Sequence, residues 1–220
     1  MDKLYVVGIG PGNAENLTIR ADEALRSCDV IVGYQVYVEL VRGRYPDKEF
    51  LTTGMTREAE RCQLALRLAA DGKKTAIICS GDSGVYGMAA LIYELRGSSS
   101  LPEIEVIPGL TAACSGAALL GAPLTHDFAV ISLSDRLTSW ETIEQRLDAA
   151  AKADLAVVLY NPASRGRPDH LRRACDILLR TLPANRLCGI ARNIGREGES
   201  CRILSLGELR DASVDMFCTI

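Results

Sequence analysis

The residues best placed to bind a ligand are the glycines that end an apolar run near the amino terminus. Residues 4–13 read LYVVGIGPGN, where Gly8 and Gly10 begin the spacing G-x-G-x-x-G that is typical of dinucleotide-binding proteins. The third glycine, which lets a helix close on the strand and hold a pyrophosphate, is replaced by Asn13, and Pro11 lies inside the turn. The segment therefore predicts a close backbone approach to a small ligand other than NAD, such as another nucleoside.

Two later segments repeat this change from an apolar run to a turn of small and polar residues. Residues 75–89 contain the turn SGDSGVYG, and residues 106–113 contain PGLTA. Ligands of open α/β sheets bind at the carboxyl ends of strands, so the three turns together predict the floor of one pocket. Taken alone, Asp82 and Thr111 are equally well explained as caps of the helices that follow. Within a pocket, Asp82 could accept a hydrogen bond or pair with a positive charge.

Residues that could move protons or hold carboxylates lie in the second half of the chain. His126 beside Asp127 could donate a proton near neutral pH, although a histidine before a strand is more often a hydrogen-bonding loop residue. Asp135 follows the next apolar run. No G-x-S-x-G elbow is present at the nearby serines, which disfavours a serine hydrolase. The planar guanidinium suits carboxylates, and four arginines that follow predicted strands are candidates: Arg165, Arg167, Arg192 and Arg196.

The elements that must position these residues alternate along the chain. Runs rich in Val and Ile predict strands at 4–9, 29–33, 75–79, 103–107, 128–133, 154–160, 187–192, 201–205 and 215–220. Amphipathic stretches predict helices at 18–27, 57–71, 85–96, 110–120, 140–151 and 168–181. Thr138 with Glu141 predicts a capping box at the start of one helix.

This order of elements predicts an α/β fold with two α/β subdomains. Up to residue 120, strand–helix alternation indicates a parallel sheet with helices on both faces. The last three strands have short connections, which indicates an antiparallel or mixed sheet. We expect subdomains at 1–121 and 122–220, with a ligand in the cleft between them. The apolar end of the chain, residues 215–220, is expected to be a final strand that is cut short.

Composition narrows the function classes. With 220 residues and a net charge of −3, no bulk field recruits nucleic acid or an anionic membrane surface. Eight cysteines without a C-x-x-C pair, and two histidines without ligand spacing, favour reduced thiols in a cytoplasmic protein and no protein-held metal. Neither a signal peptide nor a run of about 18 apolar residues is present, so no membrane partner is expected.

Taken in order, the motifs resemble those of the tetrapyrrole methylases, S-adenosylmethionine-dependent enzymes that build cobalamin and sirohaem. The resemblance covers nearly the whole chain and rests on GIGPG at 8–12, SGDSGVY at 80–86, PGLTAA at 108–113 and YNP at 160–162. Within the family, Ser83 and Asn161 resemble the ring-contracting branch that methylates C17 of a precorrin, because other members commonly have Pro and Met at these positions.

The resemblance implies a two-subdomain homodimer that holds S-adenosylmethionine in its cleft. A sulfonium ligand needs no pyrophosphate site, in agreement with the missing third glycine. Carried over by position, the residues that would contact the cofactor are Gly10, Pro11, Gly12, Ser80, Gly81, Asp82, Val85, Tyr86, Thr111, Ala112, Tyr160, Asn161 and Asn193.

The implied reaction is methyl transfer to C17 of the macrocycle, coupled to loss of its C20 bridge. Ring contraction needs groups that move protons, and the candidates are His126, Asp127, Asp135 and Asp82. Arg165, Arg167 and Arg192 would hold the peripheral carboxylates of the substrate. We expect His126→Ala to keep cofactor binding and to slow contraction.

Three alternatives stay open on the sequence. A sister enzyme would methylate another position of the macrocycle. The same fold could act on a diphthamide precursor or an rRNA nucleotide, although the acidic net charge disfavours RNA. A nucleotide-binding sensor would bind the cofactor and consume no methyl group. The sequence leaves open whether the macrocycle carries cobalt.

Overall fold

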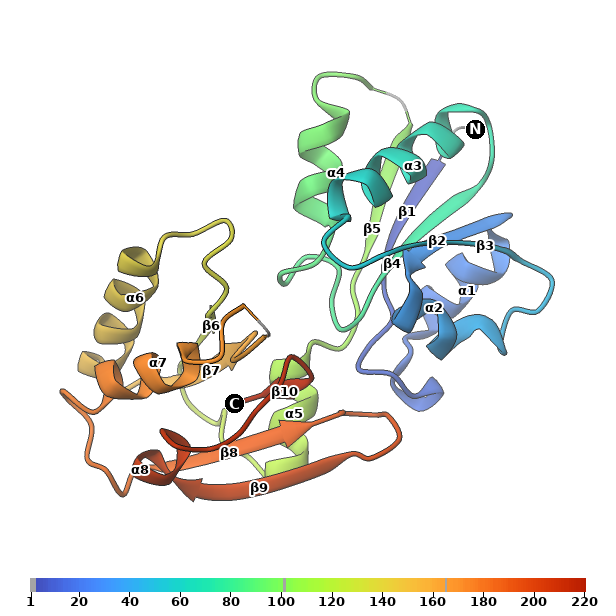
Figure 1. Cartoon of the computed structure of the whole chain (residues 1–220). Helices are drawn as coiled ribbons and strands as arrows, with labels where there is room; N and C mark the ends of the chain where they lie inside the picture. Colours follow the sequence, from blue (N-terminus) through green and yellow to red (C-terminus); the bar gives the residue numbers. More distant parts are fainter. Residues whose placement is uncertain (1–2, 101, 165) are drawn as a thin grey trace. The chain divides into compact units, whose positions relative to one another are not determined.

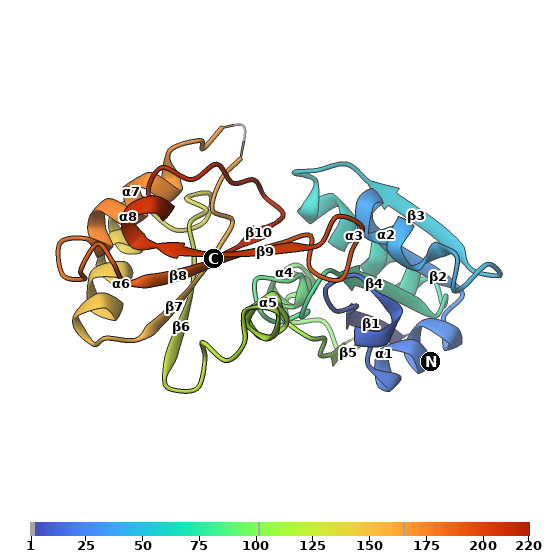
Figure 2. The ribbon, with the colours of Figure 1, turned by 90° about the horizontal axis from the view of Figure 1, so that it is seen from below.

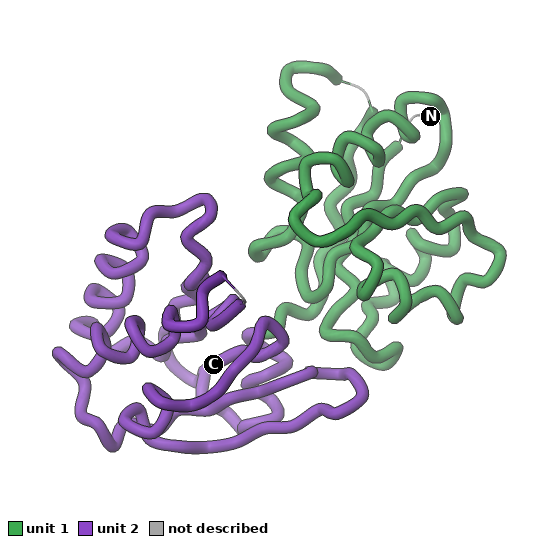
Figure 3. Tube along the Cα trace, viewed as in Figure 1, with its two compact units in different colours: residues 1–112 green, residues 113–220 purple. Residues whose placement is uncertain are grey.

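The chain folds into two compact units, which are described separately (Figure 1, Figure 3). The computed structural model describes residues 3–100, 102–164 and 166–220. The units comprise residues 1–112 and 113–220, whereas the sequence predicted a division after residue 121. The division falls earlier because helix α5 (Ala112–Leu120) packs on the second unit: a Cβ added at Gly116 would lie 3.3 Å from the Cβ of Ala191.

The first unit is built on a parallel sheet in the order β3-β2-β4-β1-β5, as the strand–helix alternation predicted (Figure 1). Its strands are β1 (Lys3–Gly8), β2 (Val30–Tyr34), β3 (Glu49–Thr53), β4 (Thr75–Cys79) and β5 (Glu103–Ile107). All neighbouring strands pair in parallel, so their carboxyl ends lie at one edge. Strand β4 is buried at all five positions, which is typical of a central strand covered on both faces.

Helices cover both faces of this sheet. They are α1 (Ile19–Ser27), α2 (Gln35–Arg42), α3 (Glu58–Ala70) and α4 (Ala89–Arg96), with a short 3-10 helix at Ala14–Asn16. Alternating side chains of β1 divide between two cores: Val7 packs with α1 and α2, and Val6 packs with α3 and α4. Helix α2 and strand β3 were not predicted from the sequence. The first begins without a side-chain cap, and the second is a partly exposed edge strand.

The second unit holds a parallel two-stranded sheet and an antiparallel three-stranded sheet, which one pair of backbone hydrogen bonds joins into a mixed sheet; its strands can be followed in Figure 2. Its strands are β6 (Phe128–Ser132), β7 (Ala156–Tyr160), β8 (Leu187–Arg192), β9 (Ser200–Ser205) and β10 (Cys218–Thr219). Strands β6 and β7 are parallel, whereas β8 pairs antiparallel with β9 and β10. Leu159 and Ile220 exchange backbone hydrogen bonds of 2.8 and 3.2 Å, which joins β7 to the segment that carries β10.

Three helices and α5 cover this sheet. Helices α6 (Trp140–Lys152), α7 (His170–Leu178) and α8 (Leu206–Leu209) share one core with the sheet. Helix α5 contacts the sheet elsewhere, at Ala191 and at Gly189, where a Cβ would meet Leu120 at 2.4 Å. Among the described residues, no helix combines the length and apolar character needed to cross a membrane.

Two local predictions need correction. The cap of α6 is Ser139 rather than Thr138, because the Ser139 side chain accepts the Thr142 N–H. Helix α4 begins at Ala89 rather than at residue 85, because residues 80–88 are used to build the turn that follows β4.

Candidate functional site

The three glycine-rich turns meet at the carboxyl edge of the first unit's sheet. They follow β4, β1 and β5, which are adjacent in the sheet. The Ile9 N–H donates to the Cys79 carbonyl at 2.9 Å, and Gly10 and Gly81 exchange backbone hydrogen bonds of 3.1 and 2.7 Å. The sequence prediction that these turns share one place is therefore confirmed for the first unit.

Glycines are required where the turns touch. A Cβ at Gly109 would lie 2.2 Å from the Gly81 carbonyl oxygen, and one at Gly8 would lie 2.6 Å from the Gly109 nitrogen. Each contact is to backbone, so no side-chain movement could relieve it. Gly10 and Gly81 also adopt positive φ angles of +71° and +69°. Gly109 was not singled out from the sequence, because its constraint comes from neighbouring strands.

Asp82 and Ser83 fix the second turn to the third. The Asp82 Oδ1 accepts the N–H groups of Gly84 and Val85 at 2.7 and 3.0 Å, and its Oδ2 accepts the Gly109 N–H at 2.9 Å. The buried Ser83 hydroxyl donates to the Ile107 carbonyl at 2.9 Å. Both carboxylate oxygens of Asp82 are thus bound to backbone, so this side chain positions the turns.

The outer rim of this cluster is suited to a nucleoside without phosphate groups. Val85 and Tyr86 are 38 % and 52 % exposed, and Tyr86 has a φ of +54°, unusual for a side chain of its size. None of the segments 8–12, 80–87 and 108–112 contains Lys or Arg. These three segments therefore offer backbone polar groups and an aromatic ring, and they supply no cation of their own to a phosphate.

In the second unit, a comparable edge forms where β6, β7 and β8 end. Strand β10 is antiparallel to β8 and, through the Leu159–Ile220 exchange, to β7, so β7 and β8 run in the same direction. Asn161 follows β7 and donates from Nδ2 to the Ser132 Oγ at 2.9 Å. Asn193 follows β8. The φ angles of Asn161 and Asn193 are +54° and +50°, a conformation that favours Asn among non-glycine residues.

Tyr160 links this edge to helix α5. Its hydroxyl accepts the Ala113 N–H at 2.7 Å, in the first turn of α5. Ala113 comes directly after Ala112, and Thr111 and Ala112 are two of the predicted cofactor contacts. The predicted residues Tyr160 and Asn161 thus lie at the end of β7, and Asn193 directly follows β8.

His126 and Asp127 lie at the other end of β6. They are exposed and precede the strand, whereas Asp135 follows it. His126 and Asp127 line a largely apolar cavity of about 780 Å³ in the second unit, together with Leu120, Leu178 and other side chains. The structure therefore separates His126 and Asp127 from the edge that carries Asp135 and Asn161.

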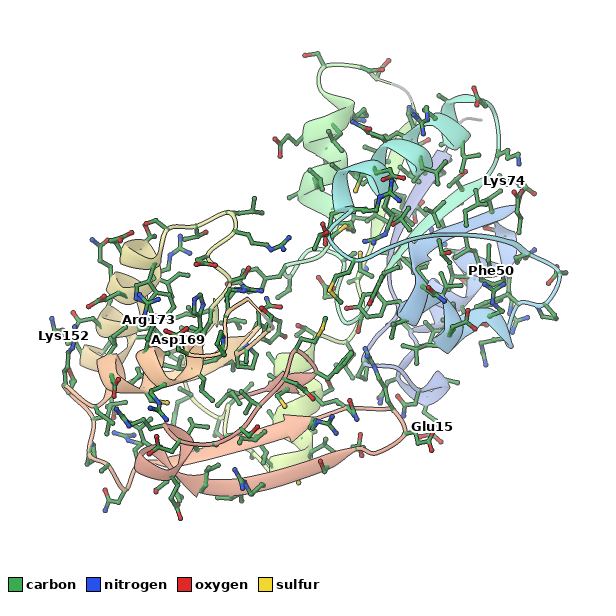
Figure 4. The ribbon with its side chains drawn as sticks, viewed as in Figure 1. Glu15, Phe50, Lys74, Lys152, Asp169 and Arg173 are labelled. Carbon is green, nitrogen blue, oxygen red and sulfur yellow. The ribbon has the colours of Figure 1, made fainter. Side chains whose placement is uncertain are left out.

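Asp135 has a partner that was not singled out from the sequence. The side chain of His170, at the start of α7, is buried, and its Nδ1 donates to the Leu133 carbonyl at 2.7 Å. Its Nε2 faces the Asp135 Oδ2 at 3.7 Å, and the Asp135 side chain is 41 % exposed. The Trp140 ring packs against His170 with centroids 4.8 Å apart, and Arg173, labelled in Figure 4, lies over Trp140.

The candidate substrate arginines differ in what they already bind. Arg167 donates from Nε to the Ser164 Oγ at 3.1 Å, and its Nη1 is buried with no hydrogen-bond partner among the described residues. Arg192 binds the Asp215 Oδ2 from Nε and Nη2 at 3.0 and 2.8 Å. Arg165 lies outside the described residues. Arg167 is therefore the better-prepared anion ligand of the two described.

The described residues offer no prepared site for a metal ion. In ranges 3–100, 102–164 and 166–220, no group of three or more His, Cys, Asp or Glu side chains is arranged to hold a metal ion. Burial raises the pKa of Cys28, Cys62 and Cys175 to about 12, so these thiols stay protonated.

Comparison with known proteins identifies what this arrangement resembles. The family model for tetrapyrrole (corrin/porphyrin) methylases matches residues 3–210. A Salmonella typhimurium protein named "Probable cobalt-factor III C(17)-methyltransferase" is 47% identical over 214 residues, which cover 97% of this chain and 89% of that protein.

Two solved structures are also similar. The methyltransferase CobJ superimposes with a TM-score of 0.90 at 35% identity, over 98% of this chain and 91% of that one. Uroporphyrin-III C-methyl transferase from Thermus thermophilus, complexed with S-adenosyl homocysteine, gives a TM-score of 0.76 over 99% and 95% of the two chains. At 20% identity, the second match shows the fold alone.

Proposed function

The chain belongs to the family of tetrapyrrole (corrin/porphyrin) methylases, and from this membership we propose that it transfers a methyl group from S-adenosylmethionine to C17 of a tetrapyrrole in cobalamin biosynthesis. The observation that carries this proposal is the 47% identity to a relative named for C17 methylation, which extends over 97% of the chain. The matched region includes nearly all of both units. Ring contraction accompanies the methylation in this proposal.

The residues at the carboxyl edge of the first unit fit the proposed cofactor. S-adenosylmethionine supplies, when bound, a methyl group on a positively charged sulfur, which is a good leaving group. The turns would bind it through backbone groups near Gly10 and Gly81, and they carry no cation that would repel the sulfonium. The Asp82 carboxylate adds a negative charge at this edge. The chain's main task is then to hold the methyl group in line with the attacking carbon.

For the proton movements of ring contraction, we favour Asp135 over His126. The geometry supports this choice because Asp135 is partly exposed at the same edge of the second unit as Asn161, while His170 faces it from the buried side. His126 and Asp127 lie at the opposite end of β6. The roles of Asp135, His126 and Asp127 in proton movement stay predictions. Comparing Asp135→Asn with His126→Ala tests which side chain the ring contraction needs.

The proposed substrate is the cobalt-containing macrocycle, after the name of the Salmonella relative. Its metal-free precorrin counterpart is the second candidate. Arg167 supports binding of a substrate carboxylate, since its Nη1 has no hydrogen-bond partner among the described residues. We also propose a cytoplasmic homodimer: the family resemblance supports the dimer, and the eight free cysteines support a reducing compartment.

The test begins with calorimetric titration of S-adenosylhomocysteine, with NAD as a parallel control. Binding of the first and not the second is expected. The enzyme is then incubated with S-adenosylmethionine and cobalt-factor III or its metal-free counterpart, and NMR of the product locates the new methyl group. A methyl group at another carbon would overturn the C17 assignment in favour of a sister reaction. Binding without any methyl transfer would indicate a sensor.

A further inference from the structure

A buried arginine lies at the carboxyl edge of the first unit's sheet, outside the turns already described. Arg61 is in the first turn of α3 and is 5 % exposed. Its Nε donates to the Thr53 Oγ1 at 2.8 Å, and its Nη2 donates to the Gly54 carbonyl at 3.0 Å. Its Cζ lies 5.7 Å from the centroid of the Tyr34 ring. These contacts fix the guanidinium in one place.

This guanidinium has no negatively charged partner in the part of the chain that the structure describes. Among the described residues, no Asp or Glu oxygen lies within 4.0 Å of a nitrogen of Arg61. Arginines nearer the surface differ, because exposed Arg44 and partly exposed Arg210 both bind carboxylates. Burying a charge is costly unless it is paired, and two neutral oxygens do not neutralise it. Within the described ranges, the two contacts with oxygen use Nε and Nη2 and leave Nη1 to receive an anion.

Arg61 shares the sheet edge with the predicted cofactor turns. Its contacts Tyr34 and Thr53 are the last residues of β2 and β3, and β2 is adjacent to β4. Burial raises the pKa of the Cys79 thiol to about 11, and the nearby charge of Arg61 opposes part of that rise. Cys79 directly precedes the Ser80–Gly81 turn. Arg61 therefore lies close to the β4 turn.

The loop after β3, which carries the Gly54 carbonyl that accepts from Arg61, has an unusual backbone conformation. Thr56 has a φ of +65°, which a β-branched residue rarely adopts. Met55, beside it, is a large apolar side chain that is 50 % exposed. Strain of this kind persists where surrounding contacts hold the backbone, and it is common in ligand-binding loops. An apolar side chain beside a prepared cation matches a ligand with an apolar face and an acidic rim.

We propose that Arg61 binds a carboxylate of the ligand that occupies this edge, through a pair of hydrogen bonds that includes Nη1. A peripheral carboxylate of the tetrapyrrole is the source we favour, and the carboxylate of the methionine part of the cofactor is the other. Arg61 is then a substrate-positioning residue with a planar fork that lysine cannot reproduce. This inference rests on the proposed function.

The test compares Arg61→Gln and Arg61→Lys with the matched control Arg67→Gln, which makes the same change at an exposed position of the same helix. Turnover kinetics give KM and kcat for the tetrapyrrole, and calorimetry gives Kd for S-adenosylhomocysteine. Because a hydrogen bond to a charged group is worth about 1.5–3 kcal/mol, Arg61→Gln should raise KM by roughly 10- to 100-fold. Kd for S-adenosylhomocysteine should stay within about twofold of the wild type, and Arg61→Lys should recover part of KM.

The outcomes are distinct. A rise in Kd for S-adenosylhomocysteine with an unchanged KM would assign the carboxylate to the cofactor. Unchanged KM and Kd in both Arg61 variants would overturn the inference. If Arg61→Gln does not fold, the wild type is assayed with a macrocycle whose carboxylates are methyl esters, and equal affinity for acid and ester overturns the inference. Absence of turnover in the wild type would instead count against the proposed function.

Discussion

Replacing Asp82 by Asn distinguishes a carboxylate that positions the turns from one that takes part in chemistry. The amide can keep an oxygen toward Gly84 and Val85, but its nitrogen then faces the Gly109 N–H, donor against donor. Gly109 cannot move away, because even a Cβ there would meet the Gly81 carbonyl oxygen at 2.2 Å. The variant therefore loses one charge-assisted hydrogen bond and weakens two.

The structure gives the size of this loss. A hydrogen bond to a charged group contributes about 1.5–3 kcal/mol, and a stranded donor adds to that cost. Because Asp82 is only half-buried, we expect the free energy of unfolding to fall by about 2–3 kcal/mol. For a chain of this length, the melting temperature should fall by roughly 4–12 °C. Affinity for S-adenosylhomocysteine should fall as well, since the turns lose their relative position.

The assay is urea unfolding together with calorimetric titration of S-adenosylhomocysteine. Asp29→Asn is the matched control, because Asp29 accepts a single backbone N–H, from Lys74 at 3.0 Å, and is exposed. It should cost less than about 1 kcal/mol. If Asp82→Asn were as stable as this control, bound S-adenosylhomocysteine normally and only turned over slowly, Asp82 would act in catalysis and the positioning argument would be refuted.

Three further predictions concern the same structure. Gly109→Ala should destabilise by about 1–3 kcal/mol in urea unfolding, whereas Gly43→Ala, whose Cβ would meet no atom within 4 Å, should not; equal stabilities would contradict the packing argument. The Arg44 guanidinium, with Arg26 and Tyr45, holds the pKa of Asp22 below its ordinary value of 3.8. The stabilisation that the Asp22 carboxylate provides is therefore present above about pH 4 and is lost as the pH falls further. Asp22→Asn should make the free energy of unfolding fall less steeply in acid, and an unchanged slope would rule this out. With dithionitrobenzoate, the exposed thiols of Cys114 and Cys201 should react first. Burial raises the pKa of Cys28, Cys62 and Cys175 to about 12, so these three thiols should react only after urea is added. Rapid reaction of all thiols would show that the cores around the buried cysteines open.

Most of the fold follows from local patterns in the sequence. Continuous apolar runs predict β1 and β4 because a central parallel strand is buried on both faces. Helix α2 has no such clear pattern, because its Val and Tyr residues also suit a strand. Only the packing of Val38 and Val41 in the core beside the sheet favours the helix over a strand. The division between units was misplaced for a similar reason. Helix α5 carries no signal for which sheet it packs on.

The site was predictable where it depends on strand ends and small residues. Glycine turns after β1, β4 and β5 converge because parallel strands end at one edge. Arg61 and His170 were not predictable, since a single polar residue in a helix gives no sign that it is buried. The placement of His126 depends on strand direction: a residue before β6 and a residue after it lie at opposite edges of the sheet.

Charges at the carboxyl edge of the first unit are separated along the strand order. Asp82 places a carboxylate where the turns after β4 and β5 meet, and Arg61 places a guanidinium at the ends of β2 and β3. Backbone N–H groups hold the Asp82 carboxylate, and neutral oxygens hold the Arg61 guanidinium, so the two charges do not neutralise each other in a direct ion pair. A ligand set that carries a positive sulfonium and a macrocycle with a negative rim would find opposite charges at the two positions. Fixed charges of this kind need no rearrangement when ligands bind, so on the proposed function the contacts that stabilise the turns would also orient the reacting groups.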